Sequence, residues 1–221
     1  MNKSDRIIFV RTNSNLLRLV SVIVAVIVCF SFIQVQTVSA ASKKSKALKA
    51  YKKVLSKKSI KWDGQKVSLK HTRFGLAYVD KDKVPELFVD SWGNTCHAQG
   101  YFALYKYKKG KVVFVRAMDD IKVYPKKSFV DFIHSGTGGY EHYYTIISGT
   151  KAKNYIHHTV YPTGTGTKLY YAKFKSPTSY NETKISKKKF NSLLKKKVGK
   201  TKAKKIKYYK NTAANRKKRL K

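Results

Sequence analysis

The stretch from Phe74 to about Phe174 constrains the fold of this chain more than any other feature. It contains runs rich in Val, Ile, Tyr, Phe and Thr, separated by Gly, Pro, Asn and Asp. This pattern is typical of β-strands joined by tight turns. No apolar spacing of helical period lies between the runs, so successive strands are expected to pair as antiparallel hairpins. The sequence therefore predicts a β-meander.

Three hairpins are expected within this stretch. The clearest covers residues 101–118, where Gly110 can take the positive φ that a tight turn needs. A second covers residues 128–149 and turns through residues 135–139, and a third covers residues 155–174.

Amphipathic helices are expected on both sides of the β-rich region. Residues 45–58 carry one apolar face, and Ser186 can cap a second helix that Gly199 ends. The apolar residues are Ala47, Leu48, Tyr51, Val54 and Leu55 in the first helix and Phe190, Leu193, Leu194 and Val198 in the second. The predicted fold class is α+β: one antiparallel β-meander sheet flanked by an N-terminal and a C-terminal helix, both on one side.

The first 40 residues have the pattern of an export signal. Basic residues precede an apolar run from Leu19 to Val35, and small residues at Val38 and Ala40 predict cleavage after Ala40. The alternative is an uncleaved membrane anchor, because a run of this length is near the lower limit for a spanning helix. The expected location is outside the cell or in the cell wall.

Positive charge is the most extreme property of the composition. The chain has 49 Lys and Arg against 11 Asp and Glu, a formal net charge of +38. Such a surplus favours association with polyanions. For an exported protein of a bacterium these are anionic polymers such as wall teichoic acid or extracellular DNA, with anionic lipid surfaces as a further option.

The C-terminal part of the chain concentrates this charge. From Ser186 to Lys221 there are 17 Lys and Arg and no acid. The expected organisation is a signal peptide at 1–40, a single α+β domain at 41–200 and a basic C-terminal extension at 201–221. Deleting residues 211–221 is expected to weaken polyanion binding without unfolding the domain. The candidate polyanion-binding residues are Lys195, Lys196, Lys197, Lys204, Lys205, Lys207, Arg216, Lys217, Lys218 and Arg219.

A short loop between two expected strands is partly suited to bind calcium. In "AYVDKDKVPELFVDS", residues 77–91, the side chains of Asp80, Asp82 and Glu86 alternate as oxygen donors, but Lys81 and Lys83 lie among them. Asp side chains also stabilise turns without metal by bonding to the local backbone.

This loop resembles one that recurs in secreted, largely uncharacterised proteins of Gram-positive gut bacteria, with the pattern D-x-[DN]-x-D-G-x-P-E-L. It is similar in turn to the calcium loops of integrin-type (FG-GAP) repeats and dockerins. The sequence matches at Asp80, Asp82 and the "PEL" of residues 85–87, and departs at Tyr78 and Lys83. The resemblance implies the strand-loop-strand architecture and export. Because a ligand and the glycine are missing, we expect a degenerate loop kept as a turn. No cofactor is expected, and calcium at Asp80, Asp82 and Glu86 is the one metal that the loop suggests.

Other candidate chemistry is weaker. If residues 135–139 close a hairpin, His134 pairs with Tyr140 and shares a face with His142, but zinc would need further ligands. Asp131 and Glu141 are one of many carboxylate pairings for glycoside hydrolysis.

The cysteine outside the signal, Cys96, is expected to be buried. It lies next to His97, and Ser135 lies next to His134, but neighbouring strand residues point apart and do not form a catalytic pair.

Two function classes follow from these observations. The favoured one is a secreted, strongly basic binding or adhesion protein that associates with anionic cell-envelope or extracellular polymers. The alternative is an unrecognised secreted hydrolase that acts on a wall or glycan polymer. A binding protein should present lysines and tyrosines on an open face, whereas a hydrolase should place perturbed acids or a nucleophile in a pocket.

Overall fold

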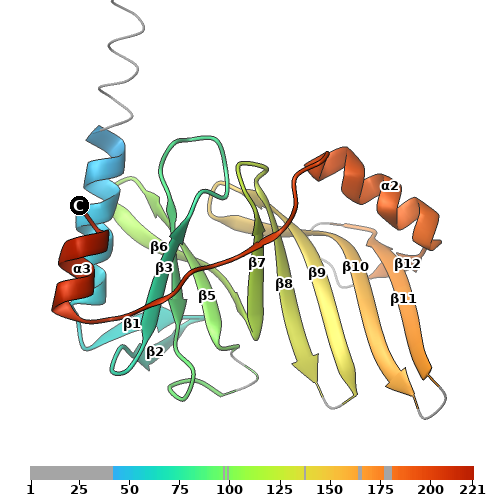
Figure 1. Cartoon of the computed structure of the whole chain (residues 1–221), viewed down its shortest axis with the longest axis horizontal. Coiled ribbons are helices and arrows are strands. Elements are labelled where there is room, and N and C mark those ends of the chain that lie inside the picture. Colours follow the sequence, from blue (N-terminus) through green and yellow to red (C-terminus); the bar gives the residue numbers. More distant parts are fainter. Residues whose placement is uncertain (1–41, 97, 99, 137, 164–165, 177–180) are drawn as a thin grey trace, which may run out of the picture. The chain divides into compact units, whose positions relative to one another are not determined.

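The computed structural model describes residues 42–96, 98, 100–136, 138–163, 166–176 and 181–221 (Figure 1). Residues 43–221 form one compact unit. The expected signal and its cleavage site lie outside the described residues. Among the helices that are described, none is long and apolar enough to cross a membrane.

Antiparallel strands dominate the described part of the chain, and they form three sheets. A small hairpin pairs β1 (Ser59–Trp62) with β2 (Gln65–Ser68). The five-stranded sheet has the order β14-β3-β4-β5-β6, with β3 at Arg73–Ala77, β4 at Glu86–Asp90, β5 at Phe102–Lys108, β6 at Lys111–Met118 and β14 at Tyr209–Lys210. The seven-stranded sheet has the order β12-β11-β10-β9-β8-β7-β13, with β7 at Asp120–Tyr124, β8 at Phe129–Gly136, β9 at Gly139–Ser148, β10 at Lys151–Thr163, β11 at Gly166–Phe174, β12 at Glu182–Lys184 and β13 at Lys204–Lys205.

The single-sheet prediction is therefore wrong, although the strands do follow a meander within each large sheet. The chain passes from one sheet to the other at Asp119, the one residue between β6 and β7. All five residues of β4 are buried, so this strand needs cover on both faces. The second sheet supplies one of the covers, since Phe88 and Leu104 share a core cluster with Val130 and Phe132.

The outer faces of the two sheets carry the helices. The first helix, α1 (residues 42–55), buries Tyr51 and Leu55 against the five-stranded sheet. Helix α2 (Lys187–Val198) buries Phe190 and Val198 against the opposite face of the seven-stranded sheet. The helices thus lie on opposite sides of a sheet-on-sheet sandwich rather than on one side of a single sheet (Figure 1).

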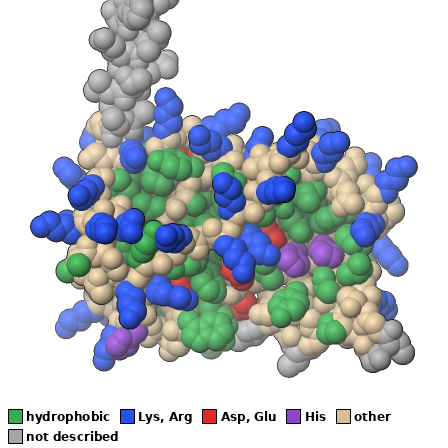
Figure 2. Space-filling model, in the orientation of Figure 1, with side chains coloured by type: hydrophobic (Ala, Val, Ile, Leu, Met, Phe, Trp, Pro, Cys, Tyr) green, Lys and Arg blue, Asp and Glu red, His purple; other side chains and the backbone are tan. Residues whose placement is uncertain are grey.

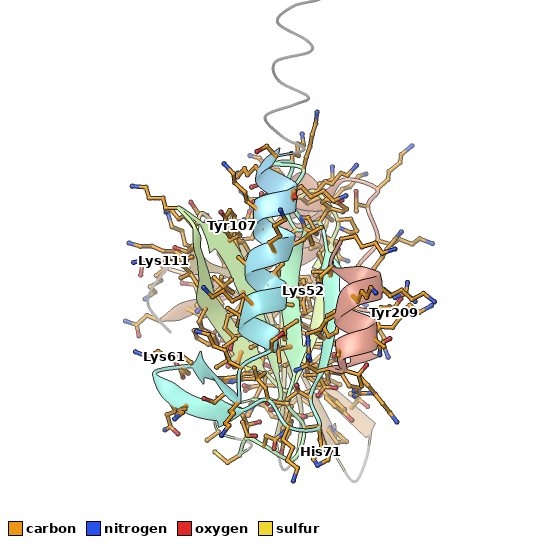
Figure 3. All side chains as sticks on the ribbon, turned by 90° about the vertical axis from the view of Figure 1, so that its left-hand side faces the viewer. Lys52, Lys61, His71, Tyr107, Lys111 and Tyr209 are labelled. Atoms are coloured by element: carbon orange, nitrogen blue, oxygen red, sulfur yellow. The ribbon has the colours of Figure 1, made fainter. Side chains whose placement is uncertain are left out.

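The C-terminal residues belong to the fold and do not form an extension. After α2 the chain runs across both large sheets, where β13 pairs with β7 and β14 pairs with β3 (Figure 1). Helix α3 (Ala213–Arg219) then lies beside α1 (Figure 3), and Leu220 is buried in the same core cluster as Tyr51. Edge pairing and this apolar anchor correct the predicted boundary at residue 200.

Local turn chemistry explains the hairpins that were expected. Lys109 and Gly110 take φ values of 48° and 80° between β5 and β6, which suits a two-residue turn. Ser186 accepts a hydrogen bond from the Lys189 amide, and Gly199 takes a φ of 61° at the end of α2. The β1-β2 hairpin was missed, although its Asp-Gly turn at residues 63–64 is a strong hairpin signal.

Candidate functional sites

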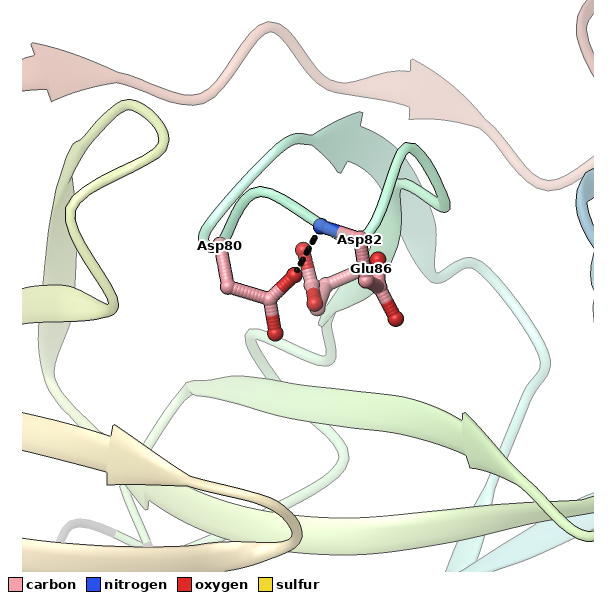
Figure 4. Close-up of side chains that lie close together, drawn as sticks. All are labelled: Asp80, Asp82 and Glu86. Carbon is pink, nitrogen blue, oxygen red and sulfur yellow. Dashed lines mark hydrogen bonds between the residues drawn. The ribbon is translucent and has the colours of Figure 1, made fainter. Parts of the chain in front are cut away.

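The β3-β4 loop forms the turn that its Asp residues favour. The Asp82 amide donates to Asp80 Oδ1 at 2.9 Å, and the Val84 amide donates to Asp82 Oδ1 at 2.9 Å (Figure 4). Lys83 takes a left-handed φ of 62°. The two Asp side chains thus stabilise the turn through the local backbone.

A lysine from another strand lies among the carboxylates of this loop. The side-chain oxygens of Asp80, Asp82 and Glu86 come within 4.8 Å of one another. Lys106 Nζ, from β5, is 2.9 Å from Glu86 Oε1 and also forms an ion pair with Asp80. Lys43 Nζ on α1 is 3.0 Å from Asp82 Oδ2. Two ammonium groups, one of them buried, thus lie against the three carboxylates of the loop.

The charges in this cluster depend on burial and on close partners. Burial favours a raised pKa for Asp80, but hydrogen bonds from Lys106 and the Asp82 amide outweigh it and lower the pKa. Burial raises the pKa of Glu86 to about 7, against the opposing effects of Lys106 and the Val79 amide. Burial favours a lowered pKa for Lys106, but the charge of Glu86 and the hydrogen bond to Asp80 raise it. Lys106 and Asp80 thus form a stable ion pair at neutral pH.

A second candidate site is the basic strip, which we define as the Lys and Arg residues from Lys195 to Arg219. All ten predicted polyanion-binding residues lie on it, in the last turn of α2, in and after β13, and in α3. Its lysines are exposed, as is Arg219, while Arg216 is half-buried. Figure 2 shows that Lys and Arg side chains stand across this face of the molecule, where acidic side chains are few.

Aromatic and amide groups hold several cations of the strip in place. The Arg219 guanidinium lies 4.1 Å from the centroid of the Tyr209 ring, and Lys207 Nζ lies 5.8 Å from the same centroid. Lys197 Nζ lies 4.9 Å from the Tyr155 centroid. Arg216 donates to the side-chain oxygen of Asn211 at 2.8 Å. The strip is thus an ordered surface.

The histidines are not arranged as the sequence suggested. In the β8-β9 hairpin, Gly136 pairs with Gly139, which places His134 opposite Glu141 and His142 opposite Ile133. His134 and His142 therefore point to opposite faces, and the prediction that they share one is wrong by one residue of register. His134 Nδ1 lies 2.8 Å from Asp119 Oδ2 instead.

The structure brings together a cluster of rings that sequence reasoning missed. His142 Nδ1 lies 3.0 Å from Asp131 Oδ2, and the His142 and His158 rings stack with centroids 5.3 Å apart. His158 also stacks on Tyr171 at 4.9 Å, and Phe190 of α2 lies beside it. Burial and the neighbouring His142 lower the pKa of His158.

The candidate hydrolytic groups do not meet in an accessible site. Asp131 and Glu141 lie on opposite faces of the sheet, because Asp131 is opposite Tyr144 in the register. Thr159, His157 and Glu182 are linked in a row as a hydroxyl nucleophile, a base and an acid would be. His157 Nε2 lies 3.0 Å from Thr159 Oγ1, and His157 Nδ1 lies 2.9 Å from Glu182 Oε2. Thr159, however, is only 1% exposed. A substrate has no access to that hydroxyl.

The pair of Cys96 and His97 falls only in part within the described residues. Cys96 is exposed rather than buried, which corrects the expectation for it, and His97 lies outside the described residues.

Comparison with known proteins gives no identification. No family model matches the chain, and none of the curated proteins does. One solved structure, titled as a Xanthomonas Type IV secretion system related protein, is similar over 51% of this chain and 57% of that one, with 10% identity and a TM-score of 0.37. This likeness is too low to define a shared fold.

Proposed function

We propose that the protein is exported and binds anionic polymers of the cell envelope or its surroundings through the basic strip. The observation that carries the proposal is that the acid-free C-terminal segment is held against both large sheets by β13 and β14. A solvated tail of the same composition would lose conformational entropy on binding, whereas the strip is already ordered.

The geometry of the strip suits a linear polymer of phosphates. Residues 200–210 run in a largely extended course across the sheets, and extended chain spans about 3.3 Å per residue, or roughly 35 Å over this segment. Wall teichoic acid and extracellular DNA are polymers that offer negative charges along such a length. Anionic lipid surfaces offer the same charge in a plane. Binding through many Lys and Arg contacts should fall steeply with salt and discriminate little among these anions.

A matched pair of triple variants tests the strip. The strip variant reverses charge in the centre of the basic strip by changing three residues to Glu: Lys204, Lys205 and Lys207. The α1 variant makes the same change on the exposed face of α1, at Lys49, Lys52 and Lys53 (Figure 3 shows Lys52). Affinity for duplex DNA and for purified teichoic acid is measured at about 50 and 200 mM salt. We expect the strip variant to lose more than about tenfold in affinity and the α1 variant much less, because local contacts dominate over net charge at these Debye lengths.

Two outcomes would contradict the proposal. Equal losses in both variants would show that charge acts diffusely and that the strip has no special part. Tight binding to a neutral glycan that persists at high salt would show that the positive charge is incidental to recognition.

A further inference from the structure

The ring cluster on the outer face of the seven-stranded sheet has the parts of a metal site. His142 and His158 lie directly opposite each other on the neighbouring strands β9 and β10. Side chains at opposed positions of an antiparallel pair project to the same face with Cβ atoms about 5 Å apart. Both histidines are partly exposed. Solvent, and therefore an ion, can reach them.

A buried carboxylate orients one of these rings. Both oxygens of Asp131 lie near His142 Nδ1, at 3.0 and 3.1 Å, and Asp131 itself is only 3% exposed. When His142 Nδ1–H donates to this carboxylate, Nε2 is left as the nitrogen with the lone pair. A carboxylate behind a histidine in this way is the usual outer support of a metal-binding imidazole.

We propose that His142 and His158 bind a divalent transition-metal ion such as Zn²⁺, with Asp131 as a positioning residue and water as the remaining ligands. Two imidazoles bound to one tetrahedral ion at about 2.1 Å per nitrogen have ring centroids about 5 Å apart. The observed separation is 5.3 Å. The rings are inclined by only 25°, so a rotation about their terminal torsions is needed to bring both lone pairs to one point.

The ligand atoms, rather than the surrounding charges, favour this class of ion over calcium. Lys122 lies opposite Asp131 in the register and Lys187 acts on His158, so positive charge surrounds the pair. Neutral imidazole nitrogens suit Zn²⁺ and Cu²⁺, which bind through directed bonds, whereas calcium requires a shell of oxygens. With two protein ligands in a positive field, binding should be weaker than at a closed structural zinc site, and Cu²⁺ should bind more tightly than Zn²⁺.

The decisive experiment is a zinc titration of the purified protein, without a histidine tag, at pH 7.5, where histidine is largely neutral. Calorimetry should give one ion per chain. In ¹H–¹³C spectra the ring signals of His142 and His158 should shift first, while those of His71, His134 and His157 should not. Zinc should also raise the melting temperature at pH 7.5 but not at pH 5, where protons compete for the nitrogens.

Variants separate the metal ligands from their neighbours. His142→Gln and His158→Gln should each weaken zinc binding by at least tenfold, whereas the control His71→Gln, at an exposed position in the turn before β3, should leave it unchanged. Asp131→Asn should weaken zinc binding by about 10- to 100-fold and change the tautomer that ¹⁵N shifts report for His142. Unchanged affinity in both ligand variants would overturn the proposal. If a variant fails to fold, the spectra of the unmodified protein decide. Ring shifts at His142 and His158 that are absent, or no larger than those of His71, His134 and His157, would also overturn the proposal.

Discussion

Lysine serves two opposite purposes in the β3-β4 loop and in the basic strip. In the loop, the side chain of Lys106 is only 8% exposed and pairs with two carboxylates that lie at the edge of the core. In the strip, the lysines are exposed and no acid occurs in the same stretch of sequence. Burial and partners therefore decide whether a lysine stabilises this fold or remains available to a ligand. Sequence composition alone does not distinguish the two.

The largest effect should come from removing the internal cation. Lys106→Met leaves the buried Glu86 and the partly buried Asp80 without their shared partner, and breaking a buried ion pair costs about 3–5 kcal/mol. The control is Lys108→Met, at an exposed position of the same strand, which should change stability by less than about 0.5 kcal/mol. Urea unfolding measures both. Equal stabilities of the two variants would show that Lys106 is as dispensable as a strip lysine.

A smaller loss of stability should follow from cutting the apolar anchor of the strip. Leu220 is 4% exposed, and leucine-to-alanine changes in cores cost about 2–5 kcal/mol. Lys218→Ala, at an exposed position of α3, is the control and should be nearly neutral. Thermal unfolding compares the two. A Leu220→Ala protein as stable as its control would restore the solvated-tail interpretation.

The same reasoning predicts that residues 211–221 cannot be deleted without cost. Asn211 donates to the Leu55 carbonyl at 3.1 Å and to Thr72 Oγ1, so the deletion removes these hydrogen bonds together with Leu220. The expectation that the deletion would not unfold the domain assumed a tail outside the fold, whereas Asn211 and Leu220 are part of it.

Local signals explain which parts of the fold were predictable. The hairpin at Gly110 and the cap at Ser186 depend on nearby residues, and the structure confirms both. By contrast, β13 and β14 are two-residue strands, one of them made only of lysine, and their pairing depends on edges formed elsewhere in the chain. The change of sheet at Asp119 has no local marker either.

The candidate sites likewise combine features that nearby residues determine with features that depend on distant parts of the chain. The Asp turn of the loop could be predicted from adjacent residues, but Lys106 lies 26 residues from Asp80, so no spacing rule joins them. The histidine cluster required the strand register. The β8-β9 register differs by one residue from the predicted one and places His134 and His142 on opposite faces, while the separate β9-β10 register puts His142 opposite His158.

The smallest effect should be that of calcium on the unmodified protein. Calcium takes six to eight oxygens, whereas this loop lacks a ligand at Tyr78 and has Lys106 between Asp80 and Glu86. The ion would have to displace an ammonium group whose own ion pairs stabilise the fold. Millimolar calcium should therefore change the melting temperature very little, because ligand stabilisation grows only with the ratio of concentration to dissociation constant.

Tyr78→Asp combined with Lys83→Gly should gain measurable affinity for calcium, and the further change Lys106→Gln should increase that affinity, since the competing cation is then absent. Calorimetric titration with calcium should show affinity rising from the unmodified protein to the double variant and then to the triple variant. Micromolar calcium binding by the unmodified protein, abolished by Asp82→Ala, would show that Lys106 yields its place to a metal and that the loop is a working calcium site.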